Sequence, residues 1–475
     1  MNKKALAGVF LALTFPLSTA QATGLVTVYE QALAFDSGLA AERFAFEAES
    51  EGVDQSRAAL LPRINAFAEA SRVDRTDLLD DFSRYRYGVR LNQPLFRADA
   101  WYNFQTSKNL SKRAQAELSM AQQELILEVA TQYFEILRAQ DTLDTAIATE
   151  AALRRQWEQA RERFNVGLIA TTEVEEARAG YDASQSRRIA AESNLDIARE
   201  ELARFTGRYH EELNRLRTDF PVTQPEPADP EAWIETAMMQ NWSIQAARFA
   251  VDASETQVKA SRAGHYPTLD FSAELARDYQ GATSQDFGGG GGQQSQVFSG
   301  SNRRTDTIVA LSLNVPLYSG GGTSSGVRRA SAERNRSEQL LESARRNARL
   351  GTRTFYRQIN TSIETLGAQR QTIVSRRSAL DATRAGYDVG TRNIVELLDA
   401  EQNYYIALRD FAEARYDYVI NTLRLKQQAG QLSPQDLIDL DRWLSASAPG
   451  IEQLAREVTR QEKRRQEQNG EDAGE

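Results

Sequence analysis

Hydrophobic and polar residues alternate with a period of two in several short stretches of the chain. In residues 268–275 the apolar side chains occupy every second position: Leu269, Phe271, Ala273 and Leu275. Residues 84–91 and 307–315 show the same alternation. This period is typical of β-strands. Such strands could form a soluble sheet with one solvent-exposed face, or they could form a transmembrane barrel. Alternation alone does not distinguish these two structures.

Two long stretches, 100–166 and 324–389, contain no proline and carry apolar residues at every third or fourth position. This spacing predicts helices, each roughly 100 Å long at 1.5 Å per residue. Helices of globular domains rarely exceed about 25 residues, so these helices indicate a coiled coil or a similar extended assembly. The segments 174–205 and 397–418 then return with a strict 3-4 apolar spacing, which favours left-handed supercoiling.

The same order of elements occurs twice. Phe164-Asn165-Val166-Gly167 returns 223 residues later as Tyr387-Asp388-Val389-Gly390. Each copy contains a helical segment (26–58 or 231–263), a pair of strands, a long helix and a returning helix. The division that we predict is a signal peptide, two repeats separated by a proline-rich connector, and a terminal segment with a polar tail: residues 1–22, 23–207, 208–230, 231–430 and 431–475.

The first residues have the features of a secretory signal peptide. Lys3 and Lys4 precede a short apolar run, and Ala20-Gln21-Ala22 offers a small-x-small cleavage pattern. The chain has no cysteine, which excludes disulfides and thiolate metal sites. Two copies of a strand pair give four strands, too few to close a barrel, whereas three protomers supply twelve. We therefore expect an exported homotrimer.

Several function classes are disfavoured. The formal net charge of −9 argues against a nucleic-acid partner, because binding to phosphates needs a basic surface. The glycine run 288–292 lacks the Gly-Lys-Ser/Thr of a phosphate loop and is expected to form an exposed loop. His210 and His265 lie in unrelated contexts, and no nucleophile motif is present. We expect neither an enzyme nor a cofactor or metal ion.

The turn after the second long helix, 386–400, and its counterpart, 163–174, resemble those of the TolC-like outer-membrane factors. The resemblance covers nearly all of the chain after residue 22. It implies a mixed α/β membrane protein: a trimeric, twelve-stranded outer-membrane β-barrel, with four strands per protomer, that continues into a long periplasmic α-helical barrel. The implied function is an exit duct for efflux of small molecules, type I protein secretion, or both. The helices would open by an iris-like movement.

The resemblance also implies roles for residues near the two turns. It places a gate latch, made of hydrogen bonds that hold the inner returning hairpin against the outer one, at four residues: Thr172, Glu173, Tyr387 and Arg392. Glu173 would be the acidic partner, which Arg392 could bind through a charge-assisted hydrogen bond. It places an acidic ring of the closed aperture at Glu396 and Asp399, whose i, i+3 spacing puts both on one side of a helix. Glutamate stands at 173 and 396 where the best-known members carry aspartate. Spacing alone favours a solvated charged face.

The two hairpin tips are Val166-Gly167-Leu168 and Val389-Gly390-Thr391. Glycine at these positions suits the left-handed turn that ends a helix. The resemblance implies that the tips contact a periplasmic adaptor (a membrane fusion protein) that works with an inner-membrane transporter, while lipid of the outer membrane surrounds the strands. The alternative from the pattern alone is a periplasmic coiled-coil adaptor or scaffold with a small soluble sheet.

Overall fold

The computed structural model describes residues 22–73, 82–280 and 302–448, together with residues 450, 457 and 460. The expected signal peptide lies outside the described residues except for Ala22, as do the glycine run 288–292 and nearly all of the polar tail. Among the described helices, none combines the length and the apolar character needed to cross a bilayer.

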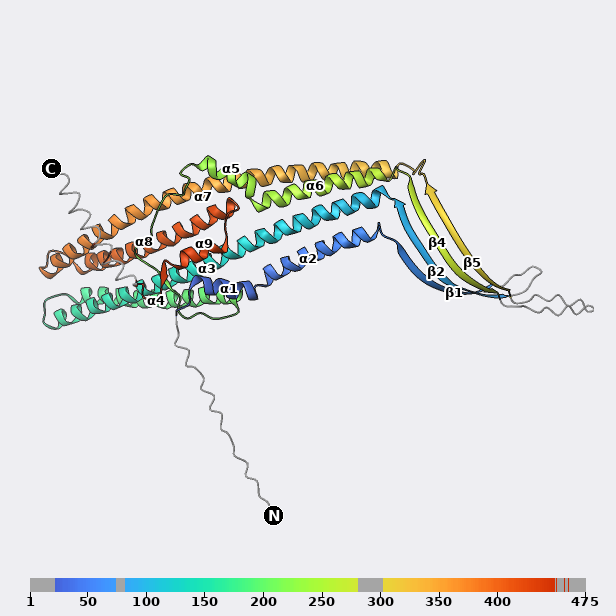
Figure 1. Cartoon of the computed structure of the whole chain (residues 1–475). Helices are drawn as coiled ribbons and strands as arrows, with labels where there is room; N and C mark the ends of the chain where they lie inside the picture. Colours follow the sequence, from blue (N-terminus) through green and yellow to red (C-terminus); the bar gives the residue numbers. More distant parts are fainter. Residues whose placement is uncertain are drawn as a thin grey trace, which may run out of the picture. The chain divides into compact units, whose positions relative to one another are not determined.

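The elements follow one another in this order (Figure 1): α1 (Leu25–Phe35), α2 (Ser37–Ala58), β1 (Arg63–Val73), β2 (Phe82–Phe96), α3 (Ala98–Asn165), α4 (Thr171–Thr206), β3 (Arg215–Leu216), α5 (Pro230–Gln240), α6 (Trp242–Ala263), β4 (Thr268–Gln280), β5 (Asn302–Asn314), α7 (Gly322–Asp388), α8 (Ile394–Gln428), α9 (Pro434–Asp441) and β6 (Leu444–Ser445). The two long helices, the returning helices and the strand pairs predicted from the sequence are confirmed. The strands extend several residues beyond the predicted stretches.

The helical segments predicted at 26–58 and 231–263 are each interrupted by one extended residue. Asp36 has φ −62° and ψ 120°, and its Oδ1 accepts the Leu39 N–H at 2.6 Å, so it ends α1 and caps α2. Asn241 interrupts the second segment in the same way, and its side chain donates to the Gln428 carbonyl at 2.9 Å. The apolar pattern continues through both breaks, which is why the sequence predicted single helices.

The described residues form two compact units. Unit 1 comprises three ranges: Met1–Leu39, Ala121–Asn241 and Ala348–Glu475. Unit 2 comprises two ranges: Ala40–Met120 and Trp242–Asn347. Each unit therefore takes segments from both of the repeats predicted at 23–207 and 231–430, and the helices α3 and α7 contribute to both units.

Unit 2 contains a four-stranded antiparallel sheet in the order β1-β2-β4-β5. The central pair, β2 and β4, joins one strand from each predicted repeat (Figure 1). Gly88 of β2 lies so close to β4 that an added Cβ would stand 2.3 Å from the Leu275 carbonyl oxygen. The absence of a side chain at Gly88 therefore permits the close approach of the two central strands.

The core of unit 1 forms where distant segments meet around α3. Tyr133 of α3 is fully buried, and its hydroxyl donates to the carbonyl oxygens of Thr23 (3.2 Å) and Asn214 (2.7 Å). Near the start of α1, the Leu25 N–H donates to Asp441 Oδ1 at 2.7 Å. The Thr23 N–H donates to the Glu212 carbonyl at 3.0 Å, so the segment before α1 is bonded to the connector, while the first residue of α1 is bonded to the end of α9.

Candidate functional site: the hairpin tips, the helix contacts and the sheet faces

Both hairpin tips have the same backbone geometry. Gly167 and Gly390 adopt left-handed φ angles of 76° and 77°. In each tip the N–H that follows the glycine donates to the carbonyl oxygen five positions earlier, at 2.9 and 2.8 Å, which ends the helix in a Schellman motif. Val166 and Val389, just before the glycines, are 69% and 75% exposed. Each tip therefore presents an apolar side chain on a well-defined turn.

Tyr387, a predicted latch residue, is buried in the last turn of α7. The Arg163 guanidinium of α3 lies over its ring, 4.9 Å from the centroid, a cation–π contact that connects the two helices. The Tyr387 hydroxyl is buried and has no hydrogen-bond partner among the described residues. The structure therefore links Tyr387 to the outer hairpin through its ring, where the sequence predicted a hydrogen bond.

Arg392 lies in the turn before α8 and pairs within its own hairpin. Its Nη1 donates to Glu396 Oε2 at 2.6 Å, while Asn393 Nδ2 donates to Glu396 Oε1 at 2.8 Å and Asn393 Oδ1 accepts the Glu396 N–H at 2.9 Å. Both carboxylate oxygens of Glu396 are therefore bonded to side chains, and Asn393 caps α8 through its Oδ1. The expected bond from Arg392 to Glu173 is not among the hydrogen bonds and ion pairs of the described residues.

Three further predicted residues, Thr172, Glu173 and Asp399, have side chains without a bonded partner among the described residues. Thr172 is exposed and Glu173 half-buried at the start of α4, and neither side chain has a hydrogen bond or ion pair among the described residues. Asp399 is exposed on α8, one turn beyond Glu396, and likewise has no partner in the described ranges. Of the two carboxylates predicted for the aperture, Asp399 alone is free to face an ion in this arrangement.

Two buried carboxylates lie between α3 and the second hairpin, and the sequence analysis missed both. Asp141 of α3 accepts a 2.6 Å hydrogen bond from the Tyr416 hydroxyl of α8, and Arg215 of β3 lies 3.5 Å away. Burial raises the pKa of Asp141 to about 6, although Tyr416 and Arg215 act in the opposite direction. The second carboxylate, Glu401 of α8, pairs with Arg384 of α7. Each of them could have been found in the sequence as a charged residue at a position where the helical pattern calls for an apolar one.

The two faces of the sheet in unit 2 differ in chemistry. One row across the four strands consists of Ile64, Leu91, Ala273 and Val309. The next row lies on the opposite face and consists of Asn65, Arg90, Glu274 and Ile308. Ile64 and Val309 are 71% and 65% exposed, so the apolar face is uncovered in the single chain.

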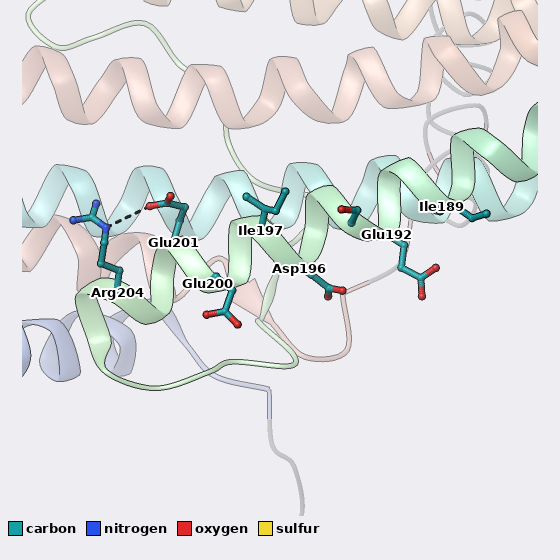
Figure 2. A pocket seen from close by; sticks show the side chains of 8 residues that line it. Ile189, Glu192, Asp196, Ile197, Glu200, Glu201 and Arg204 are labelled. Atoms are coloured by element: carbon teal, nitrogen blue, oxygen red, sulfur yellow. Dashed lines mark hydrogen bonds and ion pairs between the residues drawn. The ribbon is translucent and has the colours of Figure 1, made fainter.

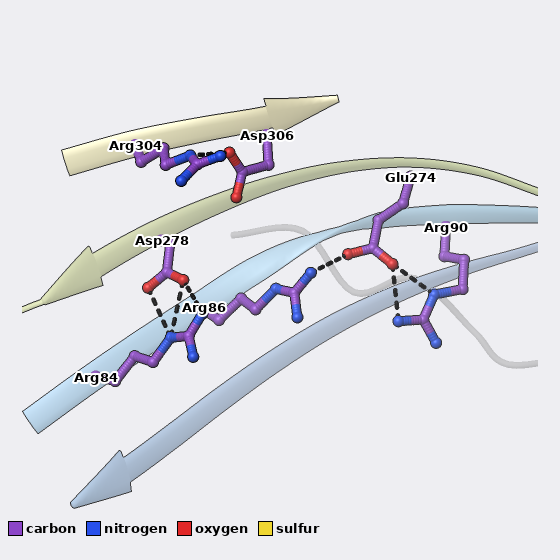
Figure 3. A network of polar contacts seen from close by, with 7 residues as sticks. All are labelled: Arg84, Arg86, Arg90, Glu274, Asp278, Arg304 and Asp306. Carbon is purple, nitrogen blue, oxygen red and sulfur yellow. Dashed lines mark hydrogen bonds and ion pairs between the residues drawn. The ribbon is translucent and has the colours of Figure 1, made fainter. Parts of the chain in front are cut away.

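Arginines of β2 and carboxylates of β4 form an ion-pair ladder on the polar face (Figure 3). Glu274 accepts from Arg86 at 2.5 Å and from Arg90 at 2.8 Å. Arg84 pairs with Asp278 one step further along the same strands. Since every pair joins β2 to β4, the charges favour this strand pairing over its alternatives.

The outer part of α4 carries a further group of charged side chains (Figure 2). Glu192, Asp196 and Glu200 follow one another at every fourth residue, beside the exposed Ile197. Arg204 pairs with Glu201 at 3.4 Å. All of these residues come from one helix, so they do not converge on a common point as catalytic groups must. Within the described ranges, no group of three His, Asp or Glu side chains is placed to hold a metal ion.

Comparison with known proteins identifies the family. The family model described as outer membrane efflux protein matches residues 28–208 and 233–431. The chain belongs to the outer membrane efflux protein family. It is 35% identical over 432 residues to the outer membrane protein TolC of Vibrio cholerae, with 90% of this chain and 96% of the relative covered. It is 29% identical to the proteases secretion protein PrtF of Dickeya chrysanthemi, with 95% and 97% covered.

The fold of this efflux protein agrees with a solved outer-membrane structure. The outer membrane protein VceC of Vibrio cholerae superimposes with a TM-score of 0.73 at 17% identity, covering 86% of this chain and 96% of that one. The family consists of outer-membrane channel and transport proteins. The predicted location in the outer membrane is thereby confirmed.

Proposed function

We propose that this efflux-family protein forms the exit duct of an outer-membrane export system, as a homotrimer whose twelve strands close a barrel that continues into a periplasmic helical tunnel. The main support for this proposal is the four-stranded sheet of unit 2, whose two faces differ in chemistry. An exposed apolar face suits hydrocarbon, while the ion-paired face suits a water-filled lumen. The open edges at β1 and β5 require partners in a membrane, and neighbouring protomers supply them.

The aperture of the duct lies at the hairpin tips and opens by an iris-like movement. Tyr387 and Arg392 form the latch, with Thr172 and Glu173 as the groups they engage across the hairpins. Arg163, whose guanidinium covers the Tyr387 ring at 4.9 Å, belongs to the same latch. Threefold symmetry repeats the acidic pair Glu396 and Asp399 around the axis, which favours cations.

The tips are the docking points for an adaptor, which belongs to a system with an inner-membrane transporter. Val166, Gly167 and Leu168 form the first tip, and Val389, Gly390 and Thr391 form the second. Exposed apolar residues on a rigid turn are suited to packing against a partner helix. The substrates are small molecules, secreted proteins, or both, since the relatives include a TolC and a proteases secretion protein.

Single-channel conductance in a planar bilayer tests this function. The detergent-extracted wild-type protein is expected to insert and show a small, mostly closed conductance. The variant Y387F/R392S is expected to conduct clearly more, because it removes the hydroxyl and the guanidinium with which the proposed latch engages Thr172 and Glu173, while the ring contact with Arg163 is kept. Failure of the wild-type protein to insert would favour a periplasmic scaffold. Insertion with equal conductance for both proteins would support the duct and contradict the assignment of Tyr387 and Arg392 to the latch.

A further inference from the structure

Glu401 occupies a core position of α8. The buried residues of this helix follow a 3-4-3-4-3 spacing: Ile394, Leu397, Glu401, Tyr404, Leu408 and Phe411. A carboxylate in such a stripe is uncommon, because an ionised group loses its hydration when it is buried. Glu401 is only 3% exposed and therefore depends on its neighbours for compensation.

The compensation comes mainly from Arg384 of α7. Arg384 Nη2 donates to Glu401 Oε1 at 2.8 Å, while the arginine itself remains 47% exposed. Glu401 Oε2 is buried and accepts no hydrogen bond of good geometry from the described residues. Burial raises the pKa of Glu401, and the charges of Arg384 and Arg155 and the amide of Gln156 oppose that rise. These three are the groups that face Glu401 from the helices packed against it.

The ion pair joins α7 to α8, and the Glu401 carboxylate faces α3, where Gln156 and Arg155 lie beside it. Gln156 of α3 is buried beside Glu401, and fifteen residues away along both helices Asp141 meets Tyr416. At the Asp141 end, Arg215 of β3 and the carbonyl groups that bind Arg415 add further restraints. At the Glu401 end, toward the hairpin tips, Arg384 is the one cation that bonds the carboxylate among the described residues.

We propose that Arg384 and Glu401 form a clamp: Arg384 of α7 neutralises the buried Glu401 of α8, which allows α8 to stay packed against α3 in the closed duct, separate from the latch at Tyr387 and Arg392. The inference rests on the proposed function of a gated duct. Without Arg384, the ionised Glu401 would be buried with no cation bonded to it and only the charge of Arg155 nearby, which is strongly unfavourable. Hydration of Glu401 requires α8 to move away from α3, which is a movement that opens the helices.

The test compares bilayer conductance of the wild type, R384M and R384M/E401Q, with Y387F/R392S as the reference for an open duct. At pH 7.5, R384M is expected to raise the mean conductance at least tenfold, and the second substitution to restore the closed level because no buried charge remains. At pH 5, R384M is expected to close again, since protonation neutralises Glu401. R154M is the control, because Arg154 belongs to an exposed i, i+4 pair with Glu158 on α3.

The pH profile and the suppression distinguish the clamp from a merely structural arginine. If R384M conducts more but neither acid nor E401Q closes it, the clamp is wrong. If Y387F/R392S opens the duct and R384M does not, the clamp is wrong while the proposed function stands. If R384M fails to assemble, R384M/E401Q must still assemble and stay closed, and its failure would overturn the inference. If the wild-type protein never inserts into the bilayer, the proposed function as an exit duct is wrong.

Discussion

Asp141 illustrates how one buried carboxylate connects three elements of unit 1. Its oxygens face Tyr416 of α8 and Arg215 of β3, and Asp144 lies on the far side of the same arginine at 2.8 Å. Burial outweighs these partners and raises the pKa of Asp141 to about 6. The folded protein therefore binds a proton at Asp141 more tightly than the unfolded chain does.

The sign of this shift predicts a pH-dependent effect of D141N. The stabilising contribution of Asp141 is fully present below its ordinary pKa of 3.8 and is lost as pH rises through about 6. Asparagine has no such dependence. The stability of D141N relative to the wild type should thus be more favourable at pH 7.5 than at pH 4, by up to roughly 3 kcal/mol for two pKa units.

Thermal melts of the detergent-purified protein at the two pH values measure this difference. Y416F is the complementary variant, because it removes a hydrogen bond that lowers the pKa of Asp141. It should be less stable than the wild type at pH 7.5, and the deficit should shrink at pH 4. A gap between D141N and the wild type that is equal at both pH values would contradict the interpretation.

At the scale of elements, periodicity predicted the helices and strands because each type repeats one spacing over many residues. The long helices α3 and α7 and the alternating strands follow directly from it. The breaks at Asp36 and Asn241 were not predictable, since each depends on hydrogen bonds that interrupt an unbroken apolar pattern. The pairing of Arg392 with Glu396 was missed for a related reason. A family resemblance predicts which residues lie in a turn. It does not predict their side-chain rotamers, which determine the hydrogen-bond partners.

The ladder between β2 and β4 predicts a charge-swap rescue. Arg84 lies diagonally across from Asp278, so R84D brings two carboxylates together and D278R brings arginines together, and each should lower the melting temperature. The double variant R84D/D278R should recover most of the loss. Exposed ion pairs contribute about 0.2–1 kcal/mol, so the shifts will amount to a few degrees.

Heat-induced loss of the folded band on a semi-native gel measures these shifts. R63D provides a matched control on the same face, since Arg63 has no ion pair in the described part of the sheet. Combining R63D with D278R should give no recovery. A double variant R84D/D278R that is no more stable than either single variant would show that the ladder does not determine the strand pairing.

For the whole assembly, the structure separates the two carboxylates that the sequence treats as equivalent. Both oxygens of Glu396 are bonded, one to Arg392 and one to Asn393, whereas Asp399 is exposed and unpaired among the described residues. Three copies of a free carboxylate around one axis create a negative potential, and three carboxylates neutralised by adjacent arginines create much less. Ion selectivity of the trimer should therefore depend on Asp399.

The corresponding prediction compares D399N with E396Q in a bilayer under a KCl gradient. The wild type should prefer cations, and D399N should move the reversal potential toward zero. E396Q should move the reversal potential less than D399N does, because the Glu396 carboxylate is held by Arg392 and Asn393 and does not face the ion. A larger loss of cation preference in E396Q than in D399N would mean that Arg392 leaves Glu396 when the trimer forms. In that case Arg392 would be free to reach Glu173, as the resemblance first implied.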